Sequence, residues 1–340
     1  MKKGPKKILI IGPCLNRKNP ELAGGPIVFF EGFIKQLDKN SVQYNIIDTN
    51  KKNYCNLFSA YINIFFQILF KQRGCSHISL HSSRDYMILG IIIIFIGKIF
   101  KKRTSIRKFG AEVINTYKES KRIKKYVLKF IFSHIDTLFL QTKYLVDFFS
   151  KINENTFWFP NVRSRVIEPT LPRSFQKRFV FVSHVIREKG IDEIIEASNQ
   201  LDRSYTIDIF GPIFDEKYTE EYFEEHNVSY NGALKADNVM QKLNEYDVVL
   251  LPSYKEGYPG IVIEAYSLGI PVIVTALQPI KEIVDPFETG ILIEPKSVEE
   301  LVNAIKYFNE NNYSSMSENA YRKFENFDFD KQIKKFLERI

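Results

Sequence analysis

Short apolar segments alternate with longer amphipathic segments along the chain, and this alternation constrains the fold more than any other feature. The first pair is the apolar run 7–12 followed by a helical pattern at 26–39, and the alternation continues to residue 159. A second series with the same order runs from 178 to 275. Strands separated by helices pair in parallel, because each helix carries the chain back across one face of the sheet. The sequence therefore predicts an α/β protein with parallel sheets in two units.

The length of the chain agrees with two units, since 340 residues exceed one ordinary domain. Between the two series, the segment 161–176 contains Pro169 and Pro172 and has little periodicity, as is typical of a linker. The predicted parts are a first domain at 1–163, a second domain at 174–325 and a C-terminal helix at 326–340. In doubly wound sheets, ligands bind beyond the carboxyl ends of the strands.

Charge is divided unevenly between the two halves. Residues 1–165 hold 29 Lys and Arg against 10 Asp and Glu, a net charge of +19. The remainder holds 19 against 30, a net charge of −11, and the two values sum to the total of +8. A split of this size predicts different partners for the two halves, with an anionic surface as the partner of the first.

Three features favour a cytoplasmic protein. The apolar run after the basic start, 8–11, is too short for a signal peptide. The apolar segment 87–100 falls short of the roughly 20 residues that span a bilayer, so we expect a buried helix there. The three cysteines are odd in number and have no metal-type spacing, which favours a reducing compartment.

Basic residues gather in the segment 118–134, which is predicted to form one amphipathic helix. One face of that helix holds Lys118, Lys121, Arg122, Lys125 and Lys129. The opposite face holds Ile123, Tyr126, Val127, Phe130, Ile131 and His134. Either the lysines are simply solvated, or they join the basic residues of 101–108 in a patch for an anionic membrane surface. Zinc-finger spacing and RNA-binding aromatic motifs are missing from the sequence, so we expect no nucleic-acid partner.

The segment 248–275 carries the sharpest chemical signal. An apolar strand at 248–251 ends at a loop that contains Glu256, a turn rich in Gly and Pro follows, and Glu264 lies on the helix after it. The free N–H groups at the start of such a helix suit a phosphate. A carboxylate can accept hydrogen bonds from two sugar hydroxyls. Two glutamates eight residues apart mean little alone, but the strand, turn and helix around them make the pattern specific.

This segment resembles the E-x7-E signature of retaining glycosyltransferases of family 4. The resemblance extends over most of the chain and is strongest from Phe179 to about Pro295. It implies the GT-B fold, in which two Rossmann-like domains face a central cleft and the C-terminal helix packs back on the first domain. It also implies that Glu256 contacts the donor sugar and Glu264 the ribose hydroxyls.

The resemblance extends the predicted donor site to two glycine-rich turns. In the family, the turn after the first glutamate meets the sugar or the diphosphate, and here it comprises Gly257, Tyr258, Pro259, Gly260 and Ile261. The pair Gly24-Gly25 resembles the family's glycine loop after the first strand. Its physics is suitable, because glycines allow close approach of the backbone and a helix is predicted to start at Pro26.

One position departs from the family pattern. The family commonly places an Arg and a Lys after the first strand of the second domain, where they hold the diphosphate. Lys189 matches the Lys, but His184 occupies the place of the Arg. Either Arg187 supplies the second cation, or His184 itself hydrogen-bonds a phosphate; otherwise Arg187 is a surface residue and His184 a packing residue.

Candidates for the acceptor side are fewer. Arg107 and Glu112 lie at and after the end of a predicted strand, and we expect one of them to meet the acceptor. Asp328 and Asp330 satisfy a D-x-D metal pattern, but their place before a helix predicted at 331–340 favours an N-cap. We therefore expect no metal and no other cofactor.

Together these features predict a glycosyltransferase with Glu256 and Lys189 as catalytic residues. The resemblance implies transfer with retention from a nucleotide-diphosphate sugar, with UDP favoured by family frequency. The expected acceptor is a glycan or a polyprenyl-pyrophosphate-linked glycan in bacterial surface-polysaccharide synthesis (capsule or O-antigen), at the inner face of the cell membrane. The alternatives are a GT-B-fold epimerase or phosphorylase and a non-catalytic sugar-nucleotide-binding protein.

Overall fold

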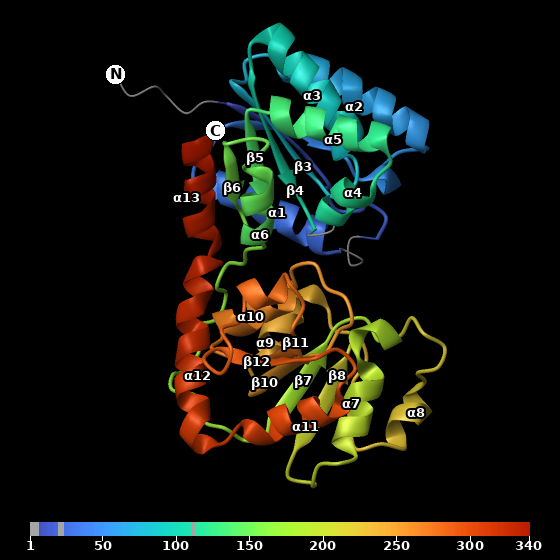
Figure 1. The fold of residues 1–340 in the computed structure, drawn as a ribbon, viewed down its shortest axis with the longest axis vertical. Helices are drawn as coiled ribbons and strands as arrows, with labels where there is room; N and C mark the ends of the chain where they lie inside the picture. Colours follow the sequence, from blue (N-terminus) through green and yellow to red (C-terminus); the bar gives the residue numbers. More distant parts are fainter. Residues whose placement is uncertain (1–6, 20–23, 111–112) are drawn as a thin grey trace. The chain divides into compact units, whose positions relative to one another are not determined.

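The computed structural model describes residues 7–19, 24–110 and 113–340 (Figure 1). The chain divides into two compact units: the first consists of residues 1–162 with 329–340, and the second of 163–328. Each unit contains one parallel six-stranded sheet with helices on its faces. The α/β prediction with two Rossmann-like units is therefore confirmed. Glu112, one of the expected acceptor residues, lies outside the described residues.

The first sheet has the strand order β2-β1-β3-β4-β5-β6. Its strands are β1 (Ile8–Gly12), β2 (Tyr44–Asp48), β3 (His77–Ser82), β4 (Arg103–Lys108), β5 (Thr137–Leu140) and β6 (Thr156–Trp158). Both faces of this sheet are buried: Leu9 and Ile11 of β1 enter one apolar core, and Ile8 and Ile10 enter the other. Burial on both faces is why the strand reads as a continuous apolar run in the sequence.

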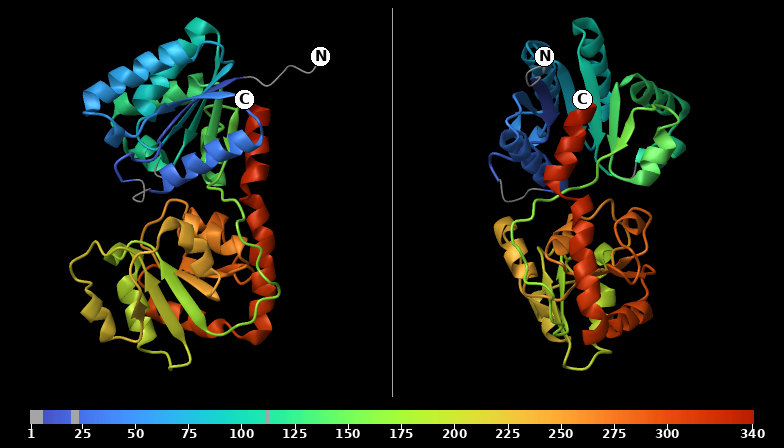
Figure 2. Two further views of the ribbon diagram at one scale, coloured as in Figure 1. Left: turned by 180° about the vertical axis from the view of Figure 1, so that it is seen from behind. Right: turned by 90° about the vertical axis from the view of Figure 1, so that its left-hand side faces the viewer.

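The helices of the first unit cover the two faces unequally. They are α1 (Gly25–Lys39), α2 (Leu57–Lys71), α3 (Tyr86–Phe100), α4 (Val113–Glu119), α5 (Arg122–His134), α6 (Lys143–Phe149) and α13 (Phe329–Arg339). Residues of α2 to α6 form the core on one face, and residues of α1 and α13 form the core on the other. Figure 2 shows α13 beside α1, with which it is in contact.

The packing of α13 on the first sheet confirms that the C-terminal helix returns to the first unit. The ring of Phe336 lies 5.1 Å from that of Phe33 and 4.8 Å from that of Phe139, measured between centroids. The helix begins at Phe329, two residues before the predicted start, so Asp330 lies in its first turn and pairs with Lys39 at 2.5 Å.

Helix α3 buries less of its surface than expected for the apolar segment 87–100. Leu89, Ile93 and Ile96 enter the core, but Ile88 and Ile99 on the other side of the helix are exposed. In the part of the chain that the structure describes, no helix is both long and apolar enough to cross a membrane.

The second sheet has the strand order β12-β11-β10-β7-β8-β9. Its strands are β7 (Arg178–Val182), β8 (Thr206–Phe210), β9 (Ser229–Tyr230), β10 (Val248–Leu251), β11 (Val272–Thr275) and β12 (Gly290–Ile293). The helices of this unit are α7 (Ile191–Ser198), α8 (Glu220–Glu224), α9 (Val239–Leu243), α10 (Gly260–Ser267), α11 (Val298–Tyr307) and α12 (Glu310–Lys323). Strands β7 and β10 are neighbours in this sheet, so the loops that follow them leave the same sheet edge.

Candidate active site

The two loops after β7 and β10 bring Lys189 and Glu256 together. Lys189 ends a 3-10 turn, η2 (Arg187–Lys189), and its Nζ lies 2.5 Å from Oε1 of Glu256. The hydroxyl of Ser253 donates a hydrogen bond to the same oxygen at 3.0 Å. Both charged side chains are largely shielded from solvent, with exposed fractions of 20% for Lys189 and 11% for Glu256. A shielded ion pair at the carboxyl end of a parallel sheet is a candidate active centre.

One carboxylate oxygen of Glu256 remains available to a ligand. Lys189 and Ser253 both bind Oε1, whereas Oε2 accepts no hydrogen bond from the residues that the structure describes. An ionised carboxylate oxygen can accept bonds from hydroxyl groups. The pair therefore offers an acceptor and a cation side by side, which suits a sugar hydroxyl and a phosphate.

A glycine allows the two loops to approach each other. Gly190 has φ of +80°, and a Cβ at this position would lie 2.4 Å from the carbonyl oxygen of Pro252. The backbone N–H of Tyr254 also donates to the carbonyl of Glu188 at 2.9 Å. Only glycine combines this backbone conformation with so close a contact. The glycine therefore positions Lys189 beside the loop that carries Glu256.

The second glutamate of the motif has a partner that the sequence analysis missed. Glu264, in the second turn of α10, accepts a hydrogen bond from Nε of Arg163 at 2.5 Å. The guanidinium lies against the first turn of α10: a Cβ at Gly260 would lie 2.0 Å from Nη2 of Arg163. Arg163 therefore fixes one oxygen of the carboxylate that was predicted to bind ribose. The partners are separated by 101 positions in the sequence, so no local sequence signal predicts this contact.

The turn between Glu256 and Glu264 offers backbone groups more than side chains. Tyr258 is buried, and this burial raises the pKa of its phenol well above the ordinary value. Pro259 occupies the N-cap position of α10, and its side chain cannot accept a hydrogen bond from the first-turn N–H groups. A Cβ at Gly257 would meet nothing within 4 Å, so this side of the turn is open. These features suit contact between backbone and ligand, as predicted for Gly257 to Ile261.

The side chains of His184 and Arg187 are exposed and contact Phe214 and Asp192, respectively. The Arg187 side chain is 70% exposed, and its Nε lies 3.6 Å from a carboxylate oxygen of Asp192. His184 is exposed and packs edge-on against Phe214, with ring centroids 4.9 Å apart. The structure thus brings Lys189 to the first glutamate and leaves both candidates for the second cation at the surface. Which of them meets a phosphate stays a prediction.

In the first unit, Gly24 and Gly25 flank the start of α1, with Gly24 at the N-cap. A Cβ at either position would meet nothing within 4 Å, so packing does not require glycine there. Their role at a diphosphate stays a prediction.

Arg107 is a core residue in this structure, which corrects the expectation that its side chain meets an acceptor. The side chain is fully buried, and its guanidinium carbon lies 3.6 Å from the ring centroid of Phe29. Nη2 donates a hydrogen bond to the carbonyl of Pro160 at 2.8 Å. The β4 position that holds Arg107 faces the aromatic core around α1 and α13, so its side chain does not reach solvent.

The basic segment 118–134 also differs from its prediction. The helix is interrupted at Ser120-Lys121, so Lys118 lies on α4, and α5 begins at Arg122. All five predicted basic residues are exposed (Lys118, Lys121, Arg122, Lys125 and Lys129). The buried face of α5 consists of Leu128, Ile131 and Phe132. Ile123 and Tyr126, which the sequence places on the face opposite the basic residues, are exposed rather than buried.

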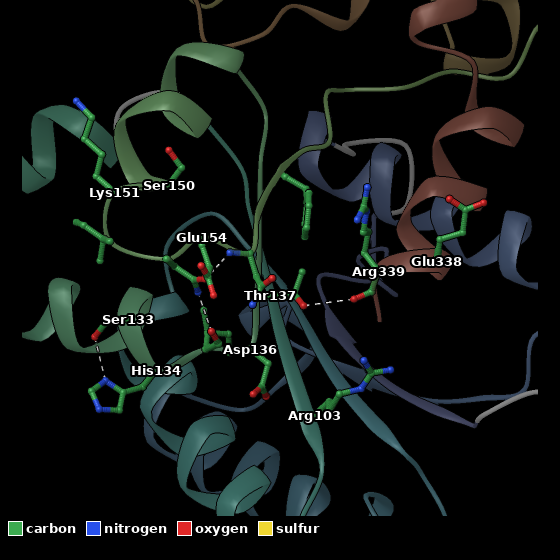
Figure 3. Close-up of a pocket in the computed structure, with 15 residues that line it drawn as sticks. Arg103, Ser133, His134, Asp136, Thr137, Ser150, Lys151, Glu154, Glu338 and Arg339 are labelled. Carbon is green, nitrogen blue, oxygen red and sulfur yellow. Dashed lines mark hydrogen bonds between the residues drawn. The ribbon is translucent and has the colours of Figure 1, made fainter.

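A cavity of about 910 Å³ lies at the amino ends of strands in the first sheet (Figure 3). Arg103 and Thr137 line it, and they are the first residues of β4 and β5. Charged side chains from α13, including Glu338 and Arg339, complete the lining. The cavity is therefore at the amino ends of the strands, where doubly wound folds do not place their ligands. Among the residues with described placement, no group of three or more His, Cys, Asp or Glu is arranged to hold a metal.

Comparison with known proteins finds a family model that matches most of the second unit. Residues 163–323 match the family model "Glycosyl transferases group 1". TuaC from Bacillus subtilis, a glycosyltransferase named for teichuronic acid biosynthesis, is 32% identical over 130 residues, which cover 38% of this chain and 32% of TuaC. The curated relatives are matched over 32% to 48% of their own length. Over this part of its length the chain is therefore similar to group 1 glycosyl transferases and to proteins named as glycosyltransferases.

Solved structures share the fold over the whole chain. Sucrose-phosphate synthase from Thermosynechococcus elongatus has a TM-score of 0.74 at 16% identity, and the match covers 97% of both chains. Anabaena Alr3699/HepE, solved in complex with UDP, has a TM-score of 0.73 at 14% identity, covering 98% of this chain and 100% of that protein. At such identities the comparison establishes the GT-B fold.

Proposed function

We propose that the protein is a retaining glycosyltransferase that uses a nucleotide-diphosphate sugar as donor. The observation that carries this proposal is the Lys189–Glu256 ion pair at the carboxyl ends of β7 and β10. This pair lies within the segment that matches the group 1 glycosyl transferase family. The E-x7-E resemblance supports assignment to family 4 and, with it, retention of anomeric configuration.

In the proposed mechanism, Glu256 binds the donor sugar and Lys189 faces the diphosphate. The free carboxylate oxygen of Glu256 accepts a hydrogen bond from a sugar hydroxyl. The ammonium group of Lys189 stabilises the charge that develops on the leaving diphosphate. The acceptor hydroxyl oxygen forms its bond to the anomeric carbon as the bond from that carbon to the diphosphate breaks, and the hydroxyl proton passes to the departing diphosphate oxygen. Glu264, which is held by Arg163, accepts hydrogen bonds from the ribose hydroxyls. Neither a general base nor a metal is assigned to this step.

We infer that the donor nucleotide is UDP and that the acceptor is a glycan or a polyprenyl-pyrophosphate-linked glycan. The UDP complex of HepE, which shares the fold, supports the nucleotide. The name of TuaC supports a role in bacterial surface-polysaccharide synthesis. The net charge of +19 over residues 1–165 supports an anionic acceptor and association with the inner face of the cell membrane.

The donor proposal is tested by thermal unfolding of the full chain with a panel of UDP- and GDP-sugars. A true donor at 100 times its Kd should stabilise the protein by about 2.7 kcal/mol. Glu264→Ala should lose this stabilisation with the same donor. Unchanged donor binding and transfer in Glu264→Ala would overturn the assigned ribose contact.

Product analysis separates the alternatives. With donor and acceptor present, transfer should give a new glycoside, detected by mass spectrometry. Formation of a sugar isomer with donor alone would instead identify an epimerase. Tight donor binding without product in an acceptor screen would identify a non-catalytic sugar-nucleotide-binding protein, for which the exposed position of His184 is the favouring observation.

A further inference from the structure

Large apolar side chains are exposed on three helices of the first unit. On α2 they are Leu57, Phe58, Ile62, Phe65, Phe66 and Phe70; on α3 they are Ile88, Phe95, Ile99 and Phe100; on α5 they are Ile123 and Tyr126. Phe58 is 77% exposed and Ile123 81%. Single exposed apolar residues are ordinary, but a contiguous group of this kind marks an interaction site.

The exposed residues follow the helical repeat. On α2, positions 58, 62, 66 and 70 recur at every fourth residue, while Ala60, Ile64 and Ile68 on the opposite side are buried. On α3 the exposed positions 88, 95 and 99 are seven and four residues apart, about two turns and one turn, so they share one side of the helix. Each helix therefore has two apolar sides, one against the sheet and one toward solvent.

The three helices form one continuous surface, which we call the α2–α3–α5 face. Helix α3 contacts both α2 and α5, and the three helices lie together on one side of the first unit in Figure 1. The rings of Phe95 and Phe130 stack with centroids 6.5 Å apart, which joins the exposed side of α3 to α5.

Positive charge surrounds this face. Between Asp48 and Glu112 the sequence contains one acidic residue, Asp85, which pairs with Lys51 at 3.2 Å. Exposed basic residues lie at the ends of the helices and along α5: Lys71, Arg73, Lys98, Lys101, Arg103, Lys121, Arg122, Lys124, Lys125 and Lys129. A second copy of the chain on this face would bring like charges together, because a twofold interface apposes a patch with itself.

We propose that the α2–α3–α5 face binds an anionic lipid bilayer, with its aromatic and aliphatic side chains inserted at the boundary between headgroups and acyl chains. Surfaces with apolar side chains and flanking Lys and Arg bind bilayers in this way, because burial and headgroup attraction add. This inference deepens the proposed membrane association and is independent of the donor site in the second unit. The proposal places the main bilayer contact on α2 and α3, and the basic residues of α5 add to it.

The test is flotation of the full-length protein with two kinds of vesicle, phosphatidylcholine alone and phosphatidylcholine with phosphatidylglycerol, at low and high salt. The wild-type protein should bind the anionic vesicles and keep part of that binding at high salt. The variant Phe58→Ser/Phe66→Ser/Ile99→Ser should lose at least about tenfold in binding at both salt concentrations. A variant with Lys121, Lys125 and Lys129 changed to Gln should lose binding mainly at low salt.

The matched control is Phe287→Ser, because Phe287 is 60% exposed and belongs to the second unit. It should bind vesicles as the wild type does. The serine variant should keep its unfolding temperature and its donor-induced stabilisation, so a loss of vesicle binding is separate from any failure of the proposed transferase. Unchanged vesicle binding by that variant would overturn the proposal. A vesicle-free dimer that the same substitutions dissociate would also overturn it, in favour of a homo-oligomer interface.

Discussion

The two units repeat one architecture and differ in where they place their polar groups. Both have a parallel six-stranded sheet covered by helices. The second unit holds charged side chains on the loops after β7 and β10, where Lys189 meets Glu256. The first unit buries charged and polar side chains in its core and exposes apolar ones on α2 and α3. The shared fold therefore does not set the chemistry, which depends on loops and outer helix faces.

The buried polar groups of the first unit form a chain within the sheet. His77 hydrogen-bonds Ser105 at 2.8 Å, Ser105 donates to Ser79 at 2.9 Å, and Ser79 meets His81 at 3.1 Å. His81 pairs in register with Arg107 across β3 and β4. Buried polar groups need such partners, since an unpaired one destabilises the fold. These groups act on stability, whereas we propose that Lys189 and Glu256 of the second unit act on a ligand.

The largest effect that this comparison predicts is on turnover. Lys189→Met should lower kcat by about 100-fold, because the charge on the leaving diphosphate loses its cation. The measurement is steady-state transfer with saturating donor. The matched control is Lys217→Met, which removes an ion pair of the same 2.5 Å length with Asp192 in the same unit. This exposed pair should contribute less than about 1 kcal/mol to the free energy of unfolding. An equal loss of kcat in the two variants would argue against a special role for Lys189.

The next effect is on stability of the second unit. Gly190→Ala should lower its free energy of unfolding by about 2 kcal/mol, because the positive φ and the contact with Pro252 both become strained. Urea unfolding followed by circular dichroism measures this change. Gly257→Ala, in the open part of the turn, should change the free energy of unfolding by less than about 1 kcal/mol. If the two alanine variants were equally stable, the close approach of the loops would not depend on Gly190.

A smaller effect is expected on donor affinity. Arg163→Met should raise the Kd for the donor nucleotide about tenfold, because Glu264 loses the charged hydrogen bond that positions it. Turnover at saturating donor should stay within about twofold, since Arg163 acts through binding. Calorimetric titration measures the Kd of Arg163→Met and of the control Arg165→Met. In the wild type, the guanidinium of Arg165 stacks on the ring of Tyr321 at 3.8 Å. A loss of affinity in Arg165→Met as large as in Arg163→Met would indicate a general disturbance of this segment.

The smallest effect concerns the pH dependence of the first unit. Burial, with the charges of Arg107 and His77, lowers the pKa of His81 well below its ordinary value. The unfolded chain therefore binds a proton below about pH 6.5 that the folded chain does not, and stability falls as the pH is lowered. His81→Gln should remove this part of the slope, at most about 1.4 kcal/mol per pH unit. Thermal unfolding between pH 7.5 and 5.5 measures the slope, and the exposed residue His134 provides the control His134→Gln, which should retain it.

Much of the fold could be predicted because strands and helices leave local patterns. The strands at 248–251 and 272–275 coincide with β10 and β11. Helix faces were harder, since the direction of a helix on its sheet depends on neighbours far along the chain. The pattern of 118–134 predicted one helix with Ile123 on the face opposite the basic residues, yet α4 and α5 are separate and Ile123 is exposed.

The site divides in the same way. The motif around Glu256 and Glu264 is local, so the sequence alone determined the strand, the turn and the helix that carry them. The contacts of those glutamates are distant: Lys189 is 67 residues from Glu256, and Arg163 is 101 from Glu264. Only the tertiary structure decided these pairings, and only it buried Arg107 while exposing Phe58. The physical reason is that periodicity records which residues share a face, whereas burial and pairing depend on what packs against that face.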